Sequence, residues 1–315
     1  MTNSKINIVL ATYNGQSYIE AQINSIIAQT YSNWELLIRD DGSTDKTLQI
    51  IKEFENVDNR INVLTDLKGN VRSCQNFSIL MSQVSKDAQY VMFCDQDDIW
   101  LEDKIERSLY AMNTLEKAHG SDGPLMVYGT YRMIDHNGKD LQLAVPDYST
   151  RPSLNLLLSQ NYIYGCTMLI NQKLLERSIP IPSTAENHDY WLALICAINN
   201  GHFSYIKQPL LLYRQHNLNV SGSYTNASLL NRVKRIFSID EIQSIKKRLA
   251  MFISLKKSVI NKSSQNALLL DNYIRVVSQG GFEAAKFCLN NNIRRKGKIQ
   301  TLLYYFNLVR AKGTM

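Results

Sequence analysis

The sequence predicts an α/β fold in which helices cover a parallel sheet. Strand-like and helix-like segments alternate four times between residues 6 and 117, which is typical of parallel strands joined by crossover helices. Hydrophobic residues make up 44% of the 315-residue chain, enough for a sizeable core. Polar clusters follow three of the strand-like segments. Because ligands of such sheets bind beyond the carboxyl ends of the strands, these clusters mark the expected site.

Each element rests on a local pattern of apolar residues. Short apolar runs predict strands, and apolar residues spaced by three or four predict helices. The predicted strands are 6–11, 34–40, 61–64 and 90–94, and the predicted helices are 17–28, 44–54, 71–83 and 103–117. A further helix is expected at 191–198 and a strand at 210–213.

Cysteine content and hydropathy indicate where the protein works. The five cysteines are odd in number, scattered and without C-x-x-C spacing, which argues against a disulfide framework or a zinc site. The N-terminal residues do not follow a signal-peptide pattern. The longest apolar run, 190–198, is shorter than the about 18 residues of a membrane-spanning helix. We therefore expect a soluble or peripheral protein in a reducing, cytoplasmic compartment.

Three carboxylates follow the fourth strand within four residues. Asp95, Asp97 and Asp98 come directly after the apolar run 90–94. Carboxylates at one strand end can together hold a hard divalent cation that keeps open positions for phosphate oxygens. The alternative is a solvated turn in which Asp98 caps the next helix. The first interpretation predicts a site that handles a diphosphate.

Polar residues also follow the first and second strands. Asn14 and Gly15 can form a tight turn beside the hydroxyl of Thr12, and Asp41 can accept the N3 proton of a pyrimidine base. We expect Ser43 to cap the following helix and to leave Asp41 free for a ligand. Neither G-x-G-x-x-G after the first strand nor G-x-x-x-x-G-K-[ST] occurs, which argues against dinucleotide-dependent redox enzymes and P-loop NTPases. A metal must therefore neutralise the diphosphate.

Two later motifs carry candidate catalytic groups. His188 and Asp189 precede the apolar helix 191–198, where the helix N-terminus stabilises and orients a carboxylate. Asp189 is therefore either a general base or only a helix cap. His216, two residues after Arg214, is either a metal or phosphate ligand or an ordinary surface histidine.

Positive charge is concentrated toward the C-terminus. Residues 226–315 carry 17 Lys and Arg against four Asp and Glu, a balance of +13 in a chain of net charge +7. Apolar clusters such as 302–306 alternate with these cations, which predicts basic amphipathic helices. Such helices bind anionic membrane surfaces, form an ordinary bundle, or make an oligomer interface. Nucleic acid is not expected because no nucleic-acid-binding motif accompanies the charge.

Six sequence motifs resemble one known family. The chain resembles the opening of the family-2 glycosyltransferases with a GT-A fold over ATYNGQSYIEAQINSIIAQTYSNWELLIRDDGSTDKT, and their D-x-D region over MFCDQDDIWLEDKIE. The match continues through MVYGTYRMIDHNGKD, NYIYGCTMLIN, HDYWLALICA and PLLLYRQHNLNVSG, so it covers roughly residues 5–222. It particularly resembles bacterial rhamnosyltransferases of cell-surface polysaccharide synthesis. The loop 68–74 departs from the shorter N-x-G-type loop of the family.

The resemblance implies a role for each candidate residue. It implies that Asp41 meets the base, Asp95 the ribose or metal, Asp97 and His216 the metal, and that Asp189 is the catalytic base. The same resemblance implies two groups of pocket residues: Thr12, Tyr13, Asn14 and Gln96 for the nucleotide sugar, and Gly165, Cys166, Thr167, His188 and Trp191 for the sugar or acceptor. For Trp191, as for Trp100, packing in the core is the expected main role.

The sequence thus predicts an inverting, metal-dependent glycosyltransferase that uses Mg²⁺ or Mn²⁺. The expected donor is a nucleotide-diphospho-sugar, first dTDP-L-rhamnose, with UDP-galactofuranose or UDP-glucose as alternatives. The expected acceptor is a growing or lipid-linked surface glycan at the inner leaflet of the bacterial inner membrane. A nucleotidyltransferase and a non-catalytic binding protein are the remaining alternatives, although residues 6–28 lack the glycine-rich triphosphate loop of the former. We expect a catalytic domain at 1–222 and a basic helical region at 223–315.

Overall fold

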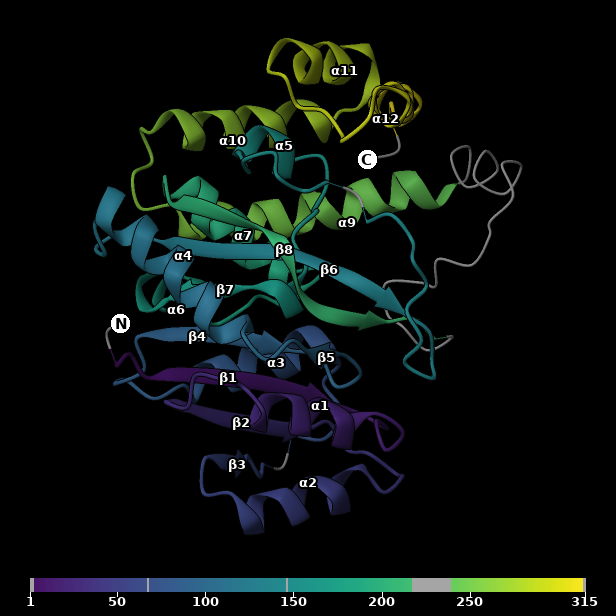
Figure 1. The fold of residues 1–315 in the computed structure, drawn as a ribbon. Helices are drawn as coiled ribbons and strands as arrows, with labels where there is room; N and C mark the ends of the chain where they lie inside the picture. The colour runs from purple at the N-terminus through teal and green to yellow at the C-terminus, as the bar shows by residue number, and fades with distance from the viewer. Residues whose placement is uncertain (1–2, 67, 146, 217–238, 314–315) are drawn as a thin grey trace.

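An eight-stranded mixed sheet runs through the protein (Figure 1). The computed structural model describes residues 3–66, 68–145, 147–216 and 239–313. Within them the strand order is β3-β2-β1-β4-β7-β6-β8-β5. The strands are β1 (Ile6–Thr12), β2 (Trp34–Asp40), β3 (Ile61–Val63), β4 (Tyr90–Cys94), β5 (Ile99–Trp100), β6 (Leu125–Ile134), β7 (Leu169–Asn171) and β8 (His202–Arg214).

The four strands β3, β2, β1 and β4 form the parallel part of the sheet. Val9 of β1 lies opposite Leu37 of β2 on one side and Phe93 of β4 on the other, and β3 pairs in parallel with β2. Every residue of β4 is buried, as expected for a strand covered on both faces. The four strands predicted from the sequence are confirmed. Their carboxyl ends lie at one edge of the sheet.

The other half of the sheet, for which the sequence predicted no strand direction, is mixed. β7 runs antiparallel to β4, with Val91 opposite Ile170, and also antiparallel to β6. β8 is parallel to β6, and the short β5 runs antiparallel to β8. An apolar run predicts a strand but not its direction, which depends on how the chain returns to the sheet. The strand predicted at 210–213 is confirmed as the end of the longer β8.

Helices cover both faces of the sheet and divide the core into two clusters. α1 (Ile19–Ile27), α2 (Thr47–Val57) and α4 (Lys104–His119) pack on one face, and α3 (Ser73–Ser82), α6 (Gln172–Ser178) and α7 (His188–Ile198) pack on the other. Alternating residues of β1 enter opposite clusters, with Ile8 and Leu10 in the first and Val9 in the second. The single turn α5 (Leu154–Leu157) and the 3₁₀ turn η1 (Gly165–Thr167) connect β6 to β7.

The predicted helix cap at Ser43 is wrong. α2 begins at Thr47, and its first turn is preceded by an Asp45 carboxylate that accepts hydrogen bonds from the Thr47 amide and hydroxyl. The Ser43 hydroxyl instead donates to Asp40 and accepts from the backbone N–H of Asn14. Ser43 therefore links the end of β2 to the turn after β1, because the Asp40 carboxylate and the Asn14 N–H occupy its hydroxyl.

The expected C-terminal helices are present: α9 (Ile239–Leu255), the 3₁₀ turn η2 (Lys256–Ser258), α10 (Gln265–Val277), α11 (Gly281–Asn290) and α12 (Lys298–Arg310). In Figure 1, α11 and α12 lie at the end of the molecule opposite β3 and α2. Phe252 packs edge-on against Tyr190 of α7, and the Tyr273 hydroxyl donates to the Leu158 carbonyl at 3.0 Å. Helices of both regions therefore share one core cluster.

The predicted domain boundary between residues 222 and 223 lies outside the described residues and stays a prediction. Among the helices of the described ranges, none is both long and apolar enough to cross a bilayer.

Candidate active site

The polar clusters after β1, β2 and β4 meet, as the sequence predicts. The Asp41 backbone N–H donates to the Thr12 carbonyl at 2.8 Å, joining the ends of β1 and β2. On the other side of β1, the side-chain oxygen of Gln96 accepts from the Thr12 hydroxyl at 2.6 Å and from the Tyr13 N–H at 2.8 Å. Gln96 therefore fixes the β1 turn to the β4 turn.

The turn at Asn14 and Gly15 depends on small residues and an unusual backbone conformation. Asn14 has φ of 49°, a left-handed value that asparagine tolerates, and its side-chain oxygen accepts from the Thr44 N–H at 2.8 Å. A Cβ on Gly15 would lie 2.3 Å from the Gln96 side-chain oxygen. The predicted tight turn is thus present, and a larger residue at its second position would displace the Gln96 side chain.

Asp41 is not free in this structure, so that expectation is wrong. It is 2% exposed, and its carboxylate forms an ion pair with buried Arg39, with 2.6 Å between the Arg39 Nη1 and the Asp41 Oδ1. The same carboxylate accepts from the backbone N–H groups of Val71 and Arg72 at 2.8 to 3.1 Å. These two residues belong to the loop that departs from the family pattern. The loop therefore folds over the carboxylate that was expected to meet the base.

The three carboxylates after β4 have different surroundings. Asp95 and Asp97 are partly exposed, whereas Asp98 is 1% exposed. Burial raises the pKa of Asp95 to about 7, and the negative charges of Asp97 and Asp189 add to this effect. Burial also raises the pKa of Asp98 well above its usual range, again with the charges of Asp97 and Asp95 contributing. The cluster therefore favours any positive charge that enters it.

Asp98 does not cap a helix. α4 begins six residues later, at Lys104. One oxygen of Asp98 accepts from the Arg214 backbone N–H at 3.1 Å, and the other has no hydrogen-bond partner among the described residues. A buried carboxylate oxygen without a partner is costly. Asp98 is therefore neither a helix cap nor a solvated side chain.

The end of β8 brings two further residues to Asp97. The His216 Nε2 lies 2.7 Å from the Asp97 Oδ2, and the Arg214 Nε donates to the Asp97 carbonyl at 2.8 Å. Tyr18, which precedes α1, stacks on the His216 ring with centroids 4.9 Å apart and lies under the Arg214 guanidinium. His216 and Asp97, predicted to share a role, are therefore direct neighbours.

A buried lysine lies behind the carboxylates. Lys104 is 0% exposed, its ammonium donates to the Cys166 carbonyl at 2.6 Å, and it lies 3.2 Å from the centroid of the Trp100 ring. Burial lowers its pKa to about 8, while the charges of Asp98 and Asp95 oppose that shift. Lys104 is thus an internal cation placed between a carboxylate cluster and an aromatic face.

The residues present fit a hard divalent cation. Asp95, Asp98 and Cys166 each bring one possible ligand atom within 4.8 Å of the others, and Asp97 and His216 stand together beside them. Carboxylate oxygens suit Mg²⁺ and Mn²⁺. A cation would pair the orphan oxygen of Asp98 and favour the ionised form of Asp95. The thiol of Cys166 is the one poor ligand, because burial raises its pKa well above the usual range.

Asp189 is held in one orientation in the first turn of α7. Its Oδ1 accepts from the Asn161 side chain at 3.1 Å and from the Tyr190 N–H at 2.6 Å, and its Oδ2 accepts from the Gly165 N–H at 3.2 Å. Burial raises the pKa of Asp189 to about 6, although these backbone bonds lower it. Asp189 lies near enough to the carboxylate cluster for its negative charge to raise the pKa of Asp95. A carboxylate with this pKa can take up a proton near neutral pH.

The five residues predicted to line a sugar or acceptor pocket are all buried in this structure, and their role at the pocket stays a prediction. His188 is 6% exposed and lies between Phe77 and Phe93, and Trp191 is 2% exposed and donates to the Ser178 carbonyl at 2.8 Å. The others, Gly165, Cys166 and Thr167, form the buried η1 turn. Apolar packing at the sheet surface takes these side chains inward, so they support the site from behind. Trp191 and Trp100 pack in the core, as expected.

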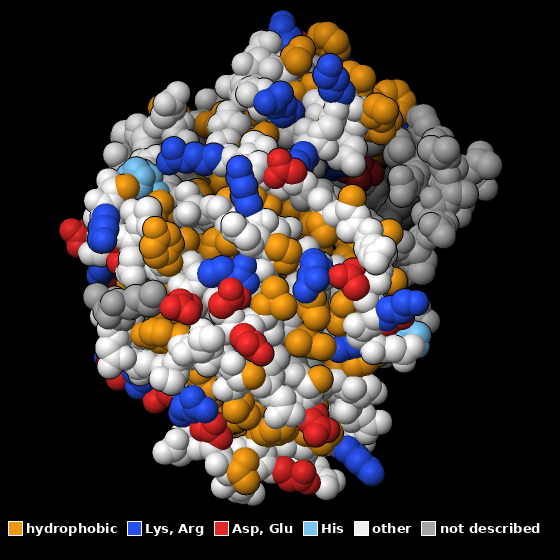
Figure 2. All heavy atoms as spheres, in the orientation of Figure 1, with side chains coloured by type: hydrophobic (Ala, Val, Ile, Leu, Met, Phe, Trp, Pro, Cys, Tyr) orange, Lys and Arg blue, Asp and Glu red, His pale blue; other side chains and the backbone are white. Residues whose placement is uncertain are grey.

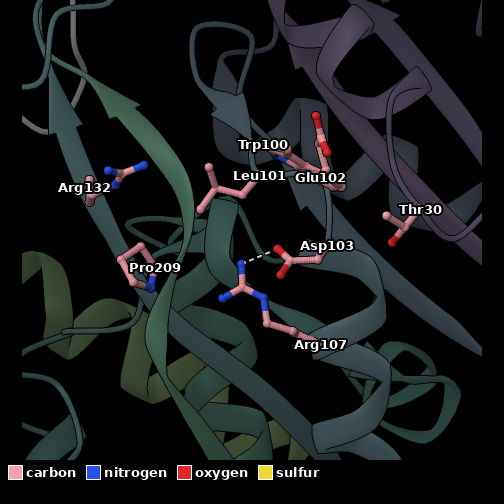
Figure 3. A pocket seen from close by; sticks show the side chains of 8 residues that line it. All are labelled: Thr30, Trp100, Leu101, Glu102, Asp103, Arg107, Arg132 and Pro209. Carbon is pink, nitrogen blue, oxygen red and sulfur yellow. Dashed lines mark hydrogen bonds and ion pairs between the residues drawn. The ribbon is translucent and has the colours of Figure 1, made fainter.

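A surface hollow of about 820 Å³ lies at β5, and Trp100 is one of its lining residues (Figure 3). Its wall comes from β5, the start of α4 and strands β6 and β8, and Arg107 pairs there with Asp103 at 2.5 Å. None of the candidate catalytic or metal-binding residues lines it. The carboxylate cluster, rather than this hollow, has the chemistry of an active site.

Sequence reasoning missed Asn161, Tyr18 and Lys104. Asn161 and Tyr18 reach the site only through tertiary contacts, so no local pattern marks them. Lys104 had one usable signal, because it shares a helix face with Ser108 and Met112 at spacings of four and eight, and both are buried.

Known proteins match this chain in sequence. Residues 7–178 match the model of the family described as Glycosyl transferase family 2. The dTDP-rhamnosyl transferase RfbG of Shigella flexneri is 29% identical over 233 residues, which are 72% of this chain and 78% of the relative. The UDP-Glc:alpha-D-GlcNAc-diphosphoundecaprenol beta-1,3-glucosyltransferase WfgD of Escherichia coli is 30% identical over 211 residues, covering 64% and 76%.

A solved structure matches the fold. It is residues 1–349 of S. aureus TarS in complex with UDP, with a TM-score of 0.57 and 16% identity over 90% of this chain and 70% of that one. The likeness supports the expected GT-A fold, with its sheet flanked by helices.

Proposed function

Because this chain belongs to glycosyl transferase family 2 and is a nucleotide-sugar-dependent glycosyltransferase, we propose that it inverts the anomeric carbon of its donor in one displacement with Asp189 as base. Membership of the family decides against the nucleotidyltransferase and the non-catalytic binding protein. The enzyme works in the synthesis of polysaccharide.

The observation that carries the proposal is the fixed carboxylate of Asp189 beside the acidic cluster. Asp189 takes the proton of an acceptor hydroxyl while that oxygen bonds to the anomeric carbon and the bond to the donor diphosphate breaks. Its three N–H donors aim one carboxylate and hold it ionised above a pKa of about 6. Positioning of base and acceptor in this way supplies much of the rate of such a reaction.

We assign Asp97, Asp95 and His216 as the residues that would hold Mg²⁺ or Mn²⁺. When bound, the ion supplies positive charge to the leaving diphosphate. The support is the donor set: two partly exposed carboxylates and an imidazole nitrogen 2.7 Å from one of them. Lys104 lies too deep to contact a donor, and its part is to limit the repulsion among the carboxylates.

For the nucleotide we assign Thr12, Tyr13, Asn14, Asp41 and Gln96. Asp41 already accepts two backbone N–H groups from the loop at 71–72, so the N3–H of a pyrimidine would replace one of these donors. Asp41→Asn would then weaken nucleotide binding without changing the pH dependence of the transfer step. Unchanged affinity for both dTDP and UDP in that variant would remove Asp41 from the nucleotide site.

The donor we propose first is dTDP-L-rhamnose. RfbG is named for dTDP-rhamnosyl transfer and aligns with nearly three quarters of the chain. WfgD, similarly related, is named for UDP-glucose, and UDP-galactofuranose is a third candidate. A panel of nucleotide sugars offered to the purified enzyme tests this choice. Turnover of UDP-sugars with dTDP-rhamnose ignored would reject the rhamnosyl assignment and leave the mechanism intact.

We propose that the acceptor is lipid-linked and that the basic C-terminal region, residues 223–315, holds the enzyme at the cytoplasmic face of the inner membrane. The support is the excess charge of +13 over residues 226–315 and a relative whose name includes a diphosphoundecaprenol acceptor. Attraction to anionic lipid should fade with salt, since charges are screened over about 8 Å at physiological ionic strength. An oligomer interface is the alternative use, and flotation with anionic vesicles at low salt separates the two.

The mechanism is tested by stereochemistry and by one matched pair of variants. Asp189→Asn should lower the transfer rate by about 10² to 10⁴-fold, the usual contribution of a general base. Asp87→Asn, which removes an exposed carboxylate paired with Lys5, should leave it unchanged. A product that retains the anomeric configuration of the donor, or an Asp189→Asn rate within a few-fold of the native rate, would contradict the proposal.

A further inference from the structure

A second cavity, of about 630 Å³, lies between the segment after β6 and the last two helices. We call it the basic cavity, because Arg294, Arg295, Lys296 and Lys298, from the connection between α11 and α12, all line it. None of its lining residues in the described ranges is acidic. The cavity is separate from the Asp189 site, since it shares no residue with the carboxylate cluster.

Two of these four cations have an acidic neighbour, which for Lys296 is Asp147. Arg295 is paired with Glu241. The ammonium of Lys296 is shielded from solvent, has no hydrogen-bond partner among the described residues, and lies 4.4 Å from the centroid of the Tyr148 ring. Arg294 and Lys298 are exposed and form no ion pair within the part of the chain that the structure describes. Cations that outnumber the acids around them favour an anionic ligand.

The backbone at the basic cavity also attracts anions, as the cations do. α12 begins at Lys298 after Gly297, whose φ of 117° turns the chain into the helix and which offers no side-chain cap. Gly297 and Thr301 both line the cavity, so the first turn of a 13-residue helix borders it. The N–H groups of a first turn have no carbonyl partner inside their helix and attract phosphate oxygens. The helix N-terminus therefore adds to the attraction of the cations for an anion.

The other side of the cavity is apolar and open. Leu289 and Leu302 line it and are nevertheless 63% and 67% exposed. Along the same two helices, Phe282, Ile299 and Phe306 are 70%, 73% and 45% exposed. Figure 2 shows hydrophobic and basic side chains side by side over α11 and α12. An anionic group in the basic cavity would therefore have hydrocarbon-binding surface next to it, which a free phosphate does not use.

We propose that the basic cavity binds the phosphate or diphosphate group of a membrane lipid, with the lipid chain against the exposed apolar residues of α11 and α12. The site rests on the proposed membrane function and deepens it, because it makes the contact specific for a lipid phosphate instead of a diffuse attraction. Charge complementarity selects the phosphate, and Leu289 and Leu302 select a lipid over a soluble anion.

The test compares two charge-matched variants of the full-length enzyme. Arg294→Gln with Lys298→Gln removes two exposed cations of the cavity, and Lys257→Gln with Lys262→Gln removes two exposed cations of the same region that do not line it. Binding is measured by co-sedimentation with phosphatidylcholine vesicles that contain a polyprenyl diphosphate. The cavity variant should bind about 30-fold more weakly, because both removed cations would contact the diphosphate, and the control variant only a few-fold more weakly, because zwitterionic phosphatidylcholine gives the vesicles little diffuse surface charge. Equal weakening in both variants would overturn the site.

Two further measurements separate the possible failures. Leu302→Ser should weaken binding to these vesicles and leave the affinity for inorganic pyrophosphate unchanged; if pyrophosphate competes fully and Leu302→Ser has no effect, the ligand is a soluble anion and the lipid proposal is overturned. Donor hydrolysis should be the same in the native enzyme and the cavity variant. A native enzyme that binds the vesicles but turns over no nucleotide sugar would refute the proposed function and leave the lipid site standing.

Discussion

Replacing Asn161 by alanine should move the acid limb of the pH profile upward. The Asn161 side chain donates to the Asp189 Oδ1 at 3.1 Å and so stabilises the ionised base. A hydrogen bond to a charged group contributes about 1.5–3 kcal/mol, and each pKa unit corresponds to about 1.4 kcal/mol. Because Asp189 is partly exposed, we take the low end, a rise of about one unit above the native pKa of about 6.

The direction of the rate change follows from the role of the base. Asp189 works only when ionised, so kcat/KM falls as the pH drops through its pKa. With the pKa one unit higher, the ionised fraction at pH near 6 falls from about one half to about one tenth, and the rate falls about five-fold. On the alkaline plateau the two enzymes should differ little.

The assay is kcat/KM against pH at saturating Mg²⁺ or Mn²⁺, with thermal unfolding to confirm the fold. Asn155→Ala is the matched control, because Asn155 donates to the Asn291 carbonyl, away from Asp189, and should leave the acid limb in place. If the Asn161→Ala limb stays at the native pH or moves lower, Asp189 is not the base that titrates. A loss of equal size at every pH would assign Asn161 a structural role only.

Three further substitutions test the surroundings of the site. Asp97→Ala should abolish the metal-dependent gain in affinity for dTDP or UDP, and calorimetry in which Mn²⁺ still strengthens binding would contradict the ligand assignment. Lys104→Met should lower the free energy of unfolding in urea by about 1–3 kcal/mol, because the buried Cys166 carbonyl loses the ammonium that donates to it; an unchanged free energy of unfolding would argue against that contact. Gly165→Ala should destabilise by about 1–3 kcal/mol, since the new Cβ would lie 2.3 Å from the His188 Nε2, and an unchanged urea midpoint would refute the contact.

The local patterns of the sequence were sufficient to predict the parallel half of the fold. The strands at 34–40 and 90–94 are correct to the residue, because a buried strand flanked by polar turns has a sharp apolar boundary. Parallel strands end at one edge of a sheet, so the alternation of strands and helices along the chain already placed the turns that hold Thr12 and Gln96 close together. The motif around Asp95 and Asp97 marked the acidic cluster before any contact was known.

Tertiary structure decided which of these side chains are open to a ligand and which are engaged. Asp41 is paired with Arg39 and covered by the loop at 71–72, and His188 is packed between two phenylalanines. Lys104 reaches Cys166, 62 positions along the chain, and Asn161 reaches Asp189 across 28. A sequence pattern reports the periodicity of neighbouring residues, whereas burial, pKa and hydrogen-bond partners depend on segments brought together from far apart. The residue types therefore predicted the chemistry of this protein, whereas only the fold determined how its site is arranged.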